Sequence, residues 1–164
     1  MDITLEKVTL EEESILQNLV QFYKYEFSIY LDTIKLNDKG LFKPFNLEDY
    51  WTKSNYHPFF IKVDGELAGF VLVRSETNTE PNSIEQFFTM KNYNGKGVGR
   101  KAAKRIFDMF PGKWKIIQIQ KNYPAQAFWR SVISDYTNDN FHERYDEEDA
   151  RSSVQEFETD KKNR

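Results

Sequence analysis

The first part of the chain passes from a strand pattern to a helix pattern. ITLEKVTL, residues 3–10, alternates apolar and polar positions and predicts a strand. Thr9 followed by Glu12 predicts a capping box that opens a helix. This helix should end near Leu31, because up to that point apolar side chains recur every three or four residues on one face: Ile15, Leu16, Leu19, Val20, Tyr23, Phe27 and Tyr30.

The middle of the chain has the pattern of an antiparallel sheet. HPFFIKVDGELAGFVLVRS, residues 57–75, contains two β-type runs joined by Asp64-Gly65, a pair that accepts the positive φ angles of a tight hairpin turn. SIEQFFTM, residues 83–90, is a further strand. We therefore expect three consecutive antiparallel strands, preceded by a loop and a short helix near NLEDYWTKS, residues 46–54.

The rest of the chain alternates helices and strands. Apolar positions from Ala102 to Phe110 form one stripe of a helix that Pro111-Gly112 ends. KWKIIQIQ, residues 113–120, predicts a strand, and NYPAQAFWRSVISDY, residues 122–136, a helix with proline in its first turn. Two late strands are expected around FHERY and VQEFET.

These elements predict an α/β (α+β) fold, with a mixed, mostly antiparallel central sheet of six to seven strands flanked by about four helices. The chain has 164 residues, of which 39% are hydrophobic, so it can bury one core and is short for two. We expect a single domain over residues 1–164.

Charge and composition narrow the possible functions. A net charge of −3 argues against general nucleic-acid binding, which usually needs a basic excess, and suits a cationic substrate. The absence of cysteine excludes disulfides and a thiol nucleophile, so any acyl transfer would be direct. His57 and His142 lack partners at metal-ligand spacing, and we expect no metal. Without a secretory signal or a run long enough to span a bilayer, we expect a cytoplasmic protein with no membrane contact.

The segment NYNGKGVGRKAA, residues 92–103, joins the third of these strands to a helix through three glycines. Such a turn can aim unpaired backbone N–H groups at an anion. The spacing excludes a GxxxxGKS/T phosphate loop. Gly97 to Ala102 matches the dinucleotide pattern GxGxxA, but four residues separate Met90 from Gly95, and Gln120 stands where an acidic ribose ligand is expected. A flexible turn without a ligand is the third alternative.

Residues 58–134 as a whole resemble the GCN5-related N-acetyltransferase (GNAT) superfamily. Its signature, R/Q-x-x-G-x-G/A before a helix, is matched with Asn94 at the Arg/Gln position and Gly97 and Gly99 at the small positions. NYPAQAFW, residues 122–129, matches the second motif of the family. The strand IEQFFTM, residues 84–90, also resembles the corresponding strand of spermidine/spermine-type diamine acetyltransferases.

The resemblance implies an acetyl-CoA site. In the family, N–H groups of the glycine turn hold the pyrophosphate of the coenzyme, strand residues pair with its pantetheine arm, and the asparagine of the second motif bonds that arm from the other side. Carried onto this chain, the cofactor-binding residues are Phe87, Phe88, Thr89, Asn94, Gly95, Lys96, Gly97, Val98, Gly99, Arg100, Lys101, Asn122, Ala125 and Trp129.

The resemblance also suggests catalytic residues. Glu85 matches a glutamate that serves as general base, and strand alternation would place it on one face with Phe87 and Thr89. The N–H of Thr89 would meet the developing oxyanion. The family usually has a tyrosine that protonates the departing thiolate where this chain has Trp129, and indole cannot supply a titratable proton. Tyr93, Tyr123 or Tyr136 could substitute, or the thiolate could leave unassisted.

Glu26 interrupts an aromatic row between Tyr23 and Tyr30 on the predicted first helix, and these three residues suit a cationic amine. We therefore expect an N-acetyltransferase acting on a primary amine, a small cationic one rather than a protein lysine, within a single ternary complex and as a possible homodimer. The departures at Trp129 and Asn94 keep open an alternative, a catalytically silent acyl-CoA-binding or partner-binding module.

Overall fold

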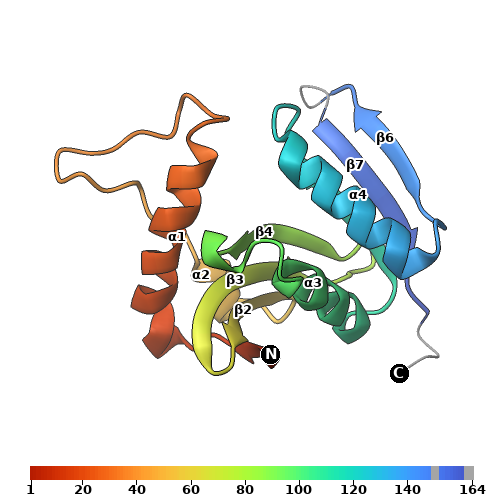
Figure 1. The fold of residues 1–164 in the computed structure, drawn as a ribbon, viewed down its shortest axis with the longest axis horizontal. Helices are drawn as coiled ribbons and strands as arrows, with labels where there is room; N and C mark the ends of the chain where they lie inside the picture. Colours follow the sequence, from red (N-terminus) through yellow and green to blue (C-terminus); the bar gives the residue numbers. More distant parts are fainter. Residues whose placement is uncertain (149–151, 161–164) are drawn as a thin grey trace.

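Four antiparallel strands form the first of two sheets in the computed structural model, which describes residues 1–148 and 152–160 (Figure 1). The strands follow one another across the sheet in sequence order: β1 Ile3–Lys7, β2 Tyr56–Val63, β3 Glu66–Arg74 and β4 Ser83–Thr89. The predicted hairpin is confirmed, because Asp64 and Gly65 join β2 to β3 with φ angles of 51° and 84°. Positive φ at both central residues matches the right-handed twist of the flanking strands.

A second antiparallel sheet contains the strands of the C-terminal part, in the order β5-β7-β6. These strands are β5 Lys113–Gln118, β6 His142–Asp146 and β7 Ser152–Glu158, so both late strands predicted from the sequence are confirmed. The described residues thus contain seven strands, within the predicted six to seven, but they are divided between two sheets.

The two sheets meet at Asn82, just before β4. The Asn82 N–H donates to the carbonyl of Lys113 at 2.8 Å, and the Lys115 N–H donates to the carbonyl of Asn82 at 2.9 Å. The Asn82 side chain is buried and bonds the Glu76 N–H and the Phe110 carbonyl, which fixes this junction. Beyond it β4 and β5 belong to different sheets and separate from each other.

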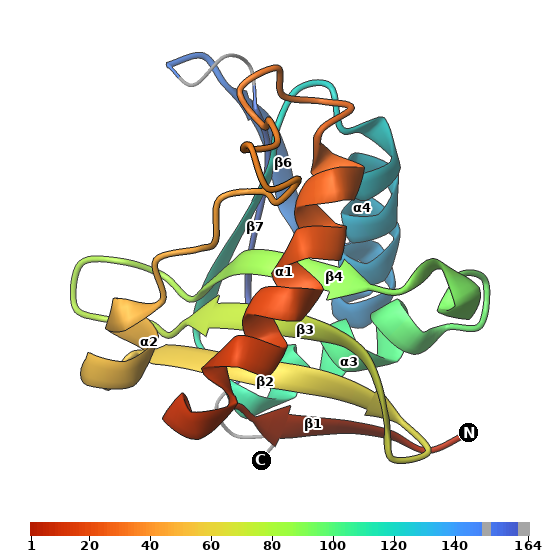
Figure 2. The ribbon, with the colours of Figure 1, turned by 90° about the vertical axis from the view of Figure 1, so that its left-hand side faces the viewer.

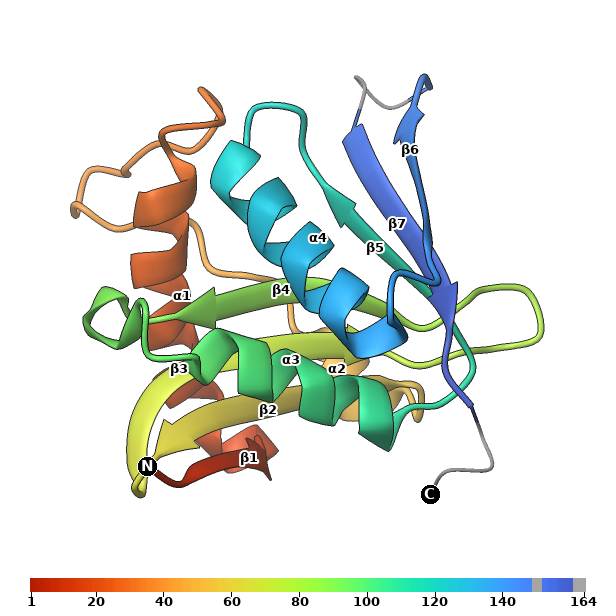
Figure 3. The same ribbon diagram turned by 45° about the vertical axis from the view of Figure 1, so that its right-hand side comes forward.

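Helices cover both faces of the first sheet and one face of the second. The first sheet lies between α1 (Glu13–Phe27) with α2 (Glu48–Thr52) on one side and α3 (Val98–Met109) on the other (Figure 2). The fourth helix, α4 (Tyr123–Thr137), runs along the second sheet (Figure 3). Short 3-10 helices at Leu10–Glu12 and Lys91–Tyr93 precede α1 and α3.

The alternation of β3 explains these layers. Phe70 and Leu72 pack in one core cluster with the buried residues of α1, whereas Val71 and Val73 pack in another with those of α3 and α4. Side chains of successive strand residues point to opposite faces, so one buried strand supplies both cores.

The first helix begins and ends differently from the prediction. At its start, the predicted Thr9–Glu12 capping box opens the 3-10 helix Leu10–Glu12, and α1 begins only at Glu13. The N–H and the hydroxyl of Thr9 both donate to the Glu12 carboxylate. It ends at Phe27 rather than near Leu31, because the Ser28 hydroxyl donates to the Tyr25 carbonyl and the Tyr30 N–H folds back onto the Phe27 carbonyl. Among the described residues, no helix is long and apolar enough to cross a membrane.

Candidate active site

The separation of β4 from β5 opens a cleft of about 640 Å³. Its walls come from the end of β4, the C-terminal end of α1 and the N-terminal end of α4. Figures 1 and 3 show these two helix ends on the same side of the molecule. The cleft brings together residues that the sequence singled out for different tasks: Tyr23, Glu26, Tyr30, Phe87, Phe88, Thr89, Asn94, Asn122, Ala125 and Trp129.

The glycine turn lies between β4 and α3. Gly95 and Gly97 have φ angles of 76° and 79°, a conformation that residues with a Cβ rarely adopt. A Cβ built at either position would meet no atom within 4 Å, so the backbone conformation, and not crowding within the protein, requires glycine here. The 3-10 helix Lys91–Tyr93 separates β4 from this turn, so the chain does not pass directly from strand to glycine as a dinucleotide motif does.

The glycine turn ends at the N-terminus of α3. In a helix, the first N–H groups have no carbonyl partner within the helix, and here those groups belong to Val98, Gly99 and Arg100. Their partial positive charge, together with the helix dipole, favours an anion at this point. Gly99 has a second role, since a Cβ there would approach the Phe128 ring to 3.2 Å; glycine allows α3 and α4 to pack closely.

The basic side chains of this region differ in their surroundings. Arg100 donates to the Ser131 hydroxyl at 2.6 Å and pairs with Asp135 at 3.4 Å, so its guanidinium links α3 to α4. The Lys96 ammonium lies 5.9 Å from the centre of the Tyr93 ring. Lys101 is exposed. Arg100 therefore contributes its main-chain N–H to the turn more directly than its side chain.

The edge of β4 faces the cleft. The Met90 N–H donates to the Ala68 carbonyl of β3 at 2.8 Å, and Phe88 is paired with Phe70. In an antiparallel pair, successive residues turn their main-chain groups to opposite sides, so those of Phe87 and Thr89 point away from β3. Across the cleft, the Asn122 side chain accepts from the Ala125 N–H at 3.1 Å and so caps α4. These groups form two facing polar edges.

Trp129 is part of the core. It is buried, and its ring packs edge-to-face against Phe87 and Phe128, with centroids 5.1 and 5.0 Å away. Among the tyrosines considered as substitutes for an acid, Tyr123 is exposed and Tyr136 donates to Asp108. Neither of these tyrosines lines the cleft.

Glu85 does not share a face with Phe87 and Thr89, so this part of the prediction is wrong. The register between β3 and β4 shifts after Leu72, and Glu85 is the extra residue between Ile84 and Gln86. The bulge turns Glu85 toward α2. There its carboxylate lies 3.3 Å from the Arg74 guanidinium and accepts from the Ser83 hydroxyl at 2.8 Å, in a hollow separate from the cleft.

Glu26 is the carboxylate that lines the cleft. Partial burial raises the pKa of Glu26, and the positive charge of Lys91 partly opposes that rise. Tyr23, one turn earlier, donates its hydroxyl to the Gln86 side chain at 2.5 Å. Burial raises the pKa of the Tyr23 phenol, which therefore stays protonated at neutral pH, and a hydrogen bond with the main chain of Phe87 opposes the rise.

Sequence reasoning missed several residues of this cleft. Lys91, Tyr25, Ile29 and Phe128 all line it. Tyr25 and Ile29 fall outside the apolar stripe expected to be buried, and no periodicity distinguishes a solvent-exposed apolar residue from one at a cleft. The residue at which α1 ends decides which of these side chains face the cleft.

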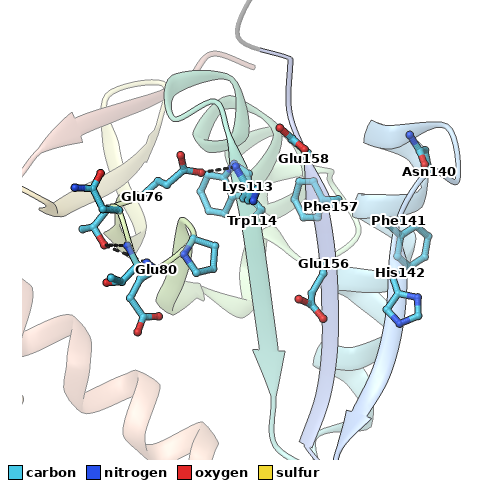
Figure 4. A pocket seen from close by; sticks show the side chains of 14 residues that line it. Glu76, Glu80, Lys113, Trp114, Asn140, Phe141, His142, Glu156, Phe157 and Glu158 are labelled. Carbon is cyan, nitrogen blue, oxygen red and sulfur yellow. Dashed lines mark hydrogen bonds between the residues drawn. The ribbon is translucent and has the colours of Figure 1, made fainter.

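A larger hollow, about 980 Å³, lies between the loop after β3 and the strands β5 and β7 (Figure 4). Carboxylates line it, but protein groups hold two of them: Glu76 accepts from the Lys113 N–H at 2.6 Å, and Glu156 from Arg144 at 2.7 Å. None of the residues predicted to bind a ligand lines this hollow. We therefore place the candidate site in the cleft beside the glycine turn.

Comparisons with known structures show the same fold. An acetyltransferase from Thermus thermophilus superposes with a TM-score of 0.67 at 16% identity, covering 96% of this chain and 97% of the other. The PaiA N-acetyltransferase of Thermoplasma acidophilum, solved with coenzyme A, gives 0.59 at 14% identity over 96% and 99%. A protein from Bacillus anthracis str. Ames, solved with acetyl coenzyme A, gives 0.59 at 12% identity over 98% and 99%.

Among proteins compared by sequence, the uncharacterized protein YrkN of Bacillus subtilis (strain 168) is 30% identical over 74 residues, which are 45% of this chain and 33% of YrkN. The chain thus matches about a third of the length of that relative. The model of the acetyltransferase (GNAT) family matches residues 15–132, a range that contains the cleft, the glycine turn and most of α4. Since this match spans more than half of the sequence, the chain belongs to the acetyltransferase (GNAT) family.

Proposed function

We propose that this protein transfers an acetyl group from acetyl-CoA directly to a primary amine, and that the amine is a small cation rather than a protein lysine. One observation carries the proposal: a single cleft is lined by the end of β4, by Asn94 and by the carboxylate of Glu26. The glycine turn and the start of α3 follow directly after Asn94, although residues 95–101 do not line the cleft themselves. When bound, acetyl-CoA supplies the activated acyl group, and the residues described below position it and handle the proton.

The glycine turn fits a pyrophosphate. The space beside Gly95 and Gly97 is open, and the N–H groups at the start of α3 are directed out of the helix. A bound anion would gain both hydrogen bonds and the favourable end of the helix dipole. Asn94 stands where the family has Arg or Gln, so less of the binding comes from a side chain and more from the backbone.

The two edges of the cleft fit an extended arm that carries amide groups. Main-chain groups of Phe87 and Thr89 are turned toward the cleft on one side, and Asn122 and Ala125 lie on the other. We assign to the N–H of Thr89 the negative charge that develops on a carbonyl oxygen, because Thr89 lines the cleft. Trp129 and Phe87 supply an apolar floor that keeps water away from this part of the cleft.

Acetyl transfer needs an amine that has lost a proton, because an alkylammonium has a pKa near about 10. Two carboxylates compete for this task. Glu26 lines the cleft, and its raised pKa makes it a better base than an ordinary carboxylate; Glu85 is held by Arg74 outside the cleft. We assign the proton to Glu26, directly or through a water molecule, and treat Glu85 as the alternative to be tested.

A silent binding module is the second candidate, because Trp129 occupies the place of the usual acid and packs in the core. The Tyr23 hydroxyl at the β4 edge does not replace this acid, because it donates its proton to the Gln86 side chain. A carboxylate in the cleft at Glu26 favours an active enzyme, from which the thiolate leaves unassisted, over the silent module.

Three measurements test the proposal. Calorimetric titration should show that CoA binds, and release of free thiol from acetyl-CoA should then follow the addition of amines from a panel of polyamines, alkylamines, amino acids and lysine peptides. Binding of CoA without thiol release on any amine would support the silent module. A thermal shift with NAD and none with acetyl-CoA would contradict both.

A further inference from the structure

The acceptor end of the cleft carries exposed apolar side chains. If the coenzyme lies along β4 and α4, the remaining wall is the C-terminal end of α1 and the turn after it, which contribute Tyr25, Ile29 and Tyr30. Tyr25 is 70% exposed and Ile29 is 79% exposed. Large apolar side chains beside a cleft are costly to leave in water, and an apolar ligand that covers them gains the free energy of their burial.

Few charged side chains line the cleft, and their opposite charges cancel. Among its lining residues in the described chain, Glu26 is the carboxylate and Lys91 is the cation. The two are close enough for the charge of Lys91 to act on the ionisation of Glu26. One ammonium group therefore finds one partner. A second ammonium on the same ligand would meet Lys91 or the apolar wall, and both are unfavourable.

The larger acidic hollow does not supply a second anionic partner. It is lined by the loop after β3 and by strands of the second sheet, and it shares no lining residue with the cleft. Glu85, which could hold a cation beside β4, is paired with Arg74. A polyamine could thus pair one of its ammonium groups with Glu26. Among the described residues, the cleft offers no second carboxylate for its remaining ammonium groups.

We infer that the acetyl acceptor is a monocationic amine with an aromatic or aliphatic body, and not a polyamine. The ammonium group lies at Glu26, and the body covers Tyr25 and Ile29. This inference rests on the proposed function and narrows it. It also departs from what the likeness of residues 84–90 to diamine acetyltransferases would suggest.

Substrate competition tests the inference. We expect kcat/KM for 2-phenylethylamine and hexylamine to exceed that for putrescine and spermidine by about 10-fold or more, since removal of apolar contacts of one or two methylenes changes specificity by that order. Tyr25→Ser and Ile29→Ser should lower the ratio of kcat/KM for hexylamine to that for putrescine, mainly through KM for hexylamine. Phe22→Ser is the matched control, because Phe22 is on the same helix as Tyr25, is 55% exposed and does not line the cleft.

A variant of Lys91 tests the effect of charge on the choice of amine. Lys91→Gln should raise kcat/KM for spermidine relative to hexylamine, because the repelling charge is gone. Calorimetry of the same amines with CoA-loaded protein gives a readout that does not depend on turnover.

The outcomes distinguish the inference about the acceptor from the proposal that the protein is an acetyltransferase. Faster acetylation of spermidine than of hexylamine, or ratios unchanged by Tyr25→Ser and Ile29→Ser, would overturn the inference and leave the acetyltransferase proposal standing. Tighter binding of hexylamine than of spermidine without thiol release would support the inferred ligand class and reject the enzymatic function. Failure of every amine to bind or react would overturn both.

Discussion

At the scale of single residues, Gly97 carries the clearest requirement. Its φ of 79° lets the chain enter α3 shortly after Asn94, which lines the cleft, and an L-residue in that conformation costs about 1–2 kcal/mol. Gly97→Val should weaken CoA binding by about 10-fold or more, because a branched side chain adds crowding at the anion to backbone strain. Calorimetric titration of CoA measures the effect.

Gly40 provides a matched control. It has a φ of 74°, and a Cβ there also meets no atom within 4 Å, but it lies in the loop between α1 and α2. Gly40→Val should lower the melting temperature to a similar extent and leave CoA affinity as in the wild type. Equal affinities for the wild type and Gly97→Val would show that the turn does not hold the coenzyme.

Glu26 and Glu85 form the second comparison at this scale. Glu26→Gln should reduce kcat by about 100-fold, the usual contribution of a positioned base, whereas Glu85→Gln should reduce it much less. In the wild type, kcat/KM should rise with pH as Glu26 ionises above its ordinary value of 4.5, and the variant should lack that part of the profile. A larger loss of kcat in Glu85→Gln than in Glu26→Gln would show that Glu85 is the general base.

Glu26→Gln lowers activity, but it should not lower the stability of the folded protein. The pKa of Glu26 is raised in the folded protein, so ionisation of Glu26 favours the unfolded state once the pH exceeds the unfolded value. The variant should therefore melt at the same temperature as the wild type in acid and at an equal or higher temperature at neutral pH.

At the scale of elements, Asp135 adds a charge contact between α3 and α4. Its carboxylate accepts from Lys104 and pairs with Arg100, both on α3. The hydrogen bond from Lys104 is the main cause that lowers the pKa of Asp135 below its usual value of 3.8, so this stabilisation is present above that pH and is lost as the pH falls through the folded pKa.

Asp135→Asn should accordingly lower the melting temperature slightly at neutral pH, with a difference that disappears in strong acid. The effect is small because the pair is exposed to solvent. A difference that stays constant down to acid would show that packing, and not charge, is responsible.

Elements set by local chemistry could be predicted from the sequence. Asp64-Gly65 specifies a turn by itself, and Asn122 with Pro124 specifies the start of α4, as the structure confirms. The orientation of Glu85 could not be predicted, because the bulge depends on the register between β3 and β4, which is settled by the packing of both faces. The end of α1 at Phe27 depends on the Ser28 hydroxyl, and it decides which residues reach the cleft.

At the scale of the whole molecule, the cleft exists because the sheets are joined at one end. The Asn82 side chain is buried and makes hydrogen bonds to Glu76 and Phe110, so Asn82→Ala leaves their main-chain groups without those partners. We expect a loss of about 1–3 kcal/mol in the free energy of unfolding. Because the geometry of the cleft depends on this junction, KM for acetyl-CoA should rise as well.

Denaturant unfolding and steady-state kinetics measure the two effects of Asn82→Ala. Ser75→Ala, a change in the same loop region at a side chain that bonds His57, serves as a control for general destabilisation. A loss of stability equal to that of the control, with an unchanged KM, would mean that the junction does not shape the cleft.

The same separation leaves β4 and β5 each with a side that no neighbouring strand occupies beyond Asn82 in the described part of the chain. Strands with unpaired edges invite pairing with other extended chains, and this is a common start of aggregation. An extended ligand that pairs with β4 would complete the row of hydrogen bonds and close one of these edges. Saturation with coenzyme should thus keep concentrated solutions of the protein clear for longer, independently of whether an amine is present.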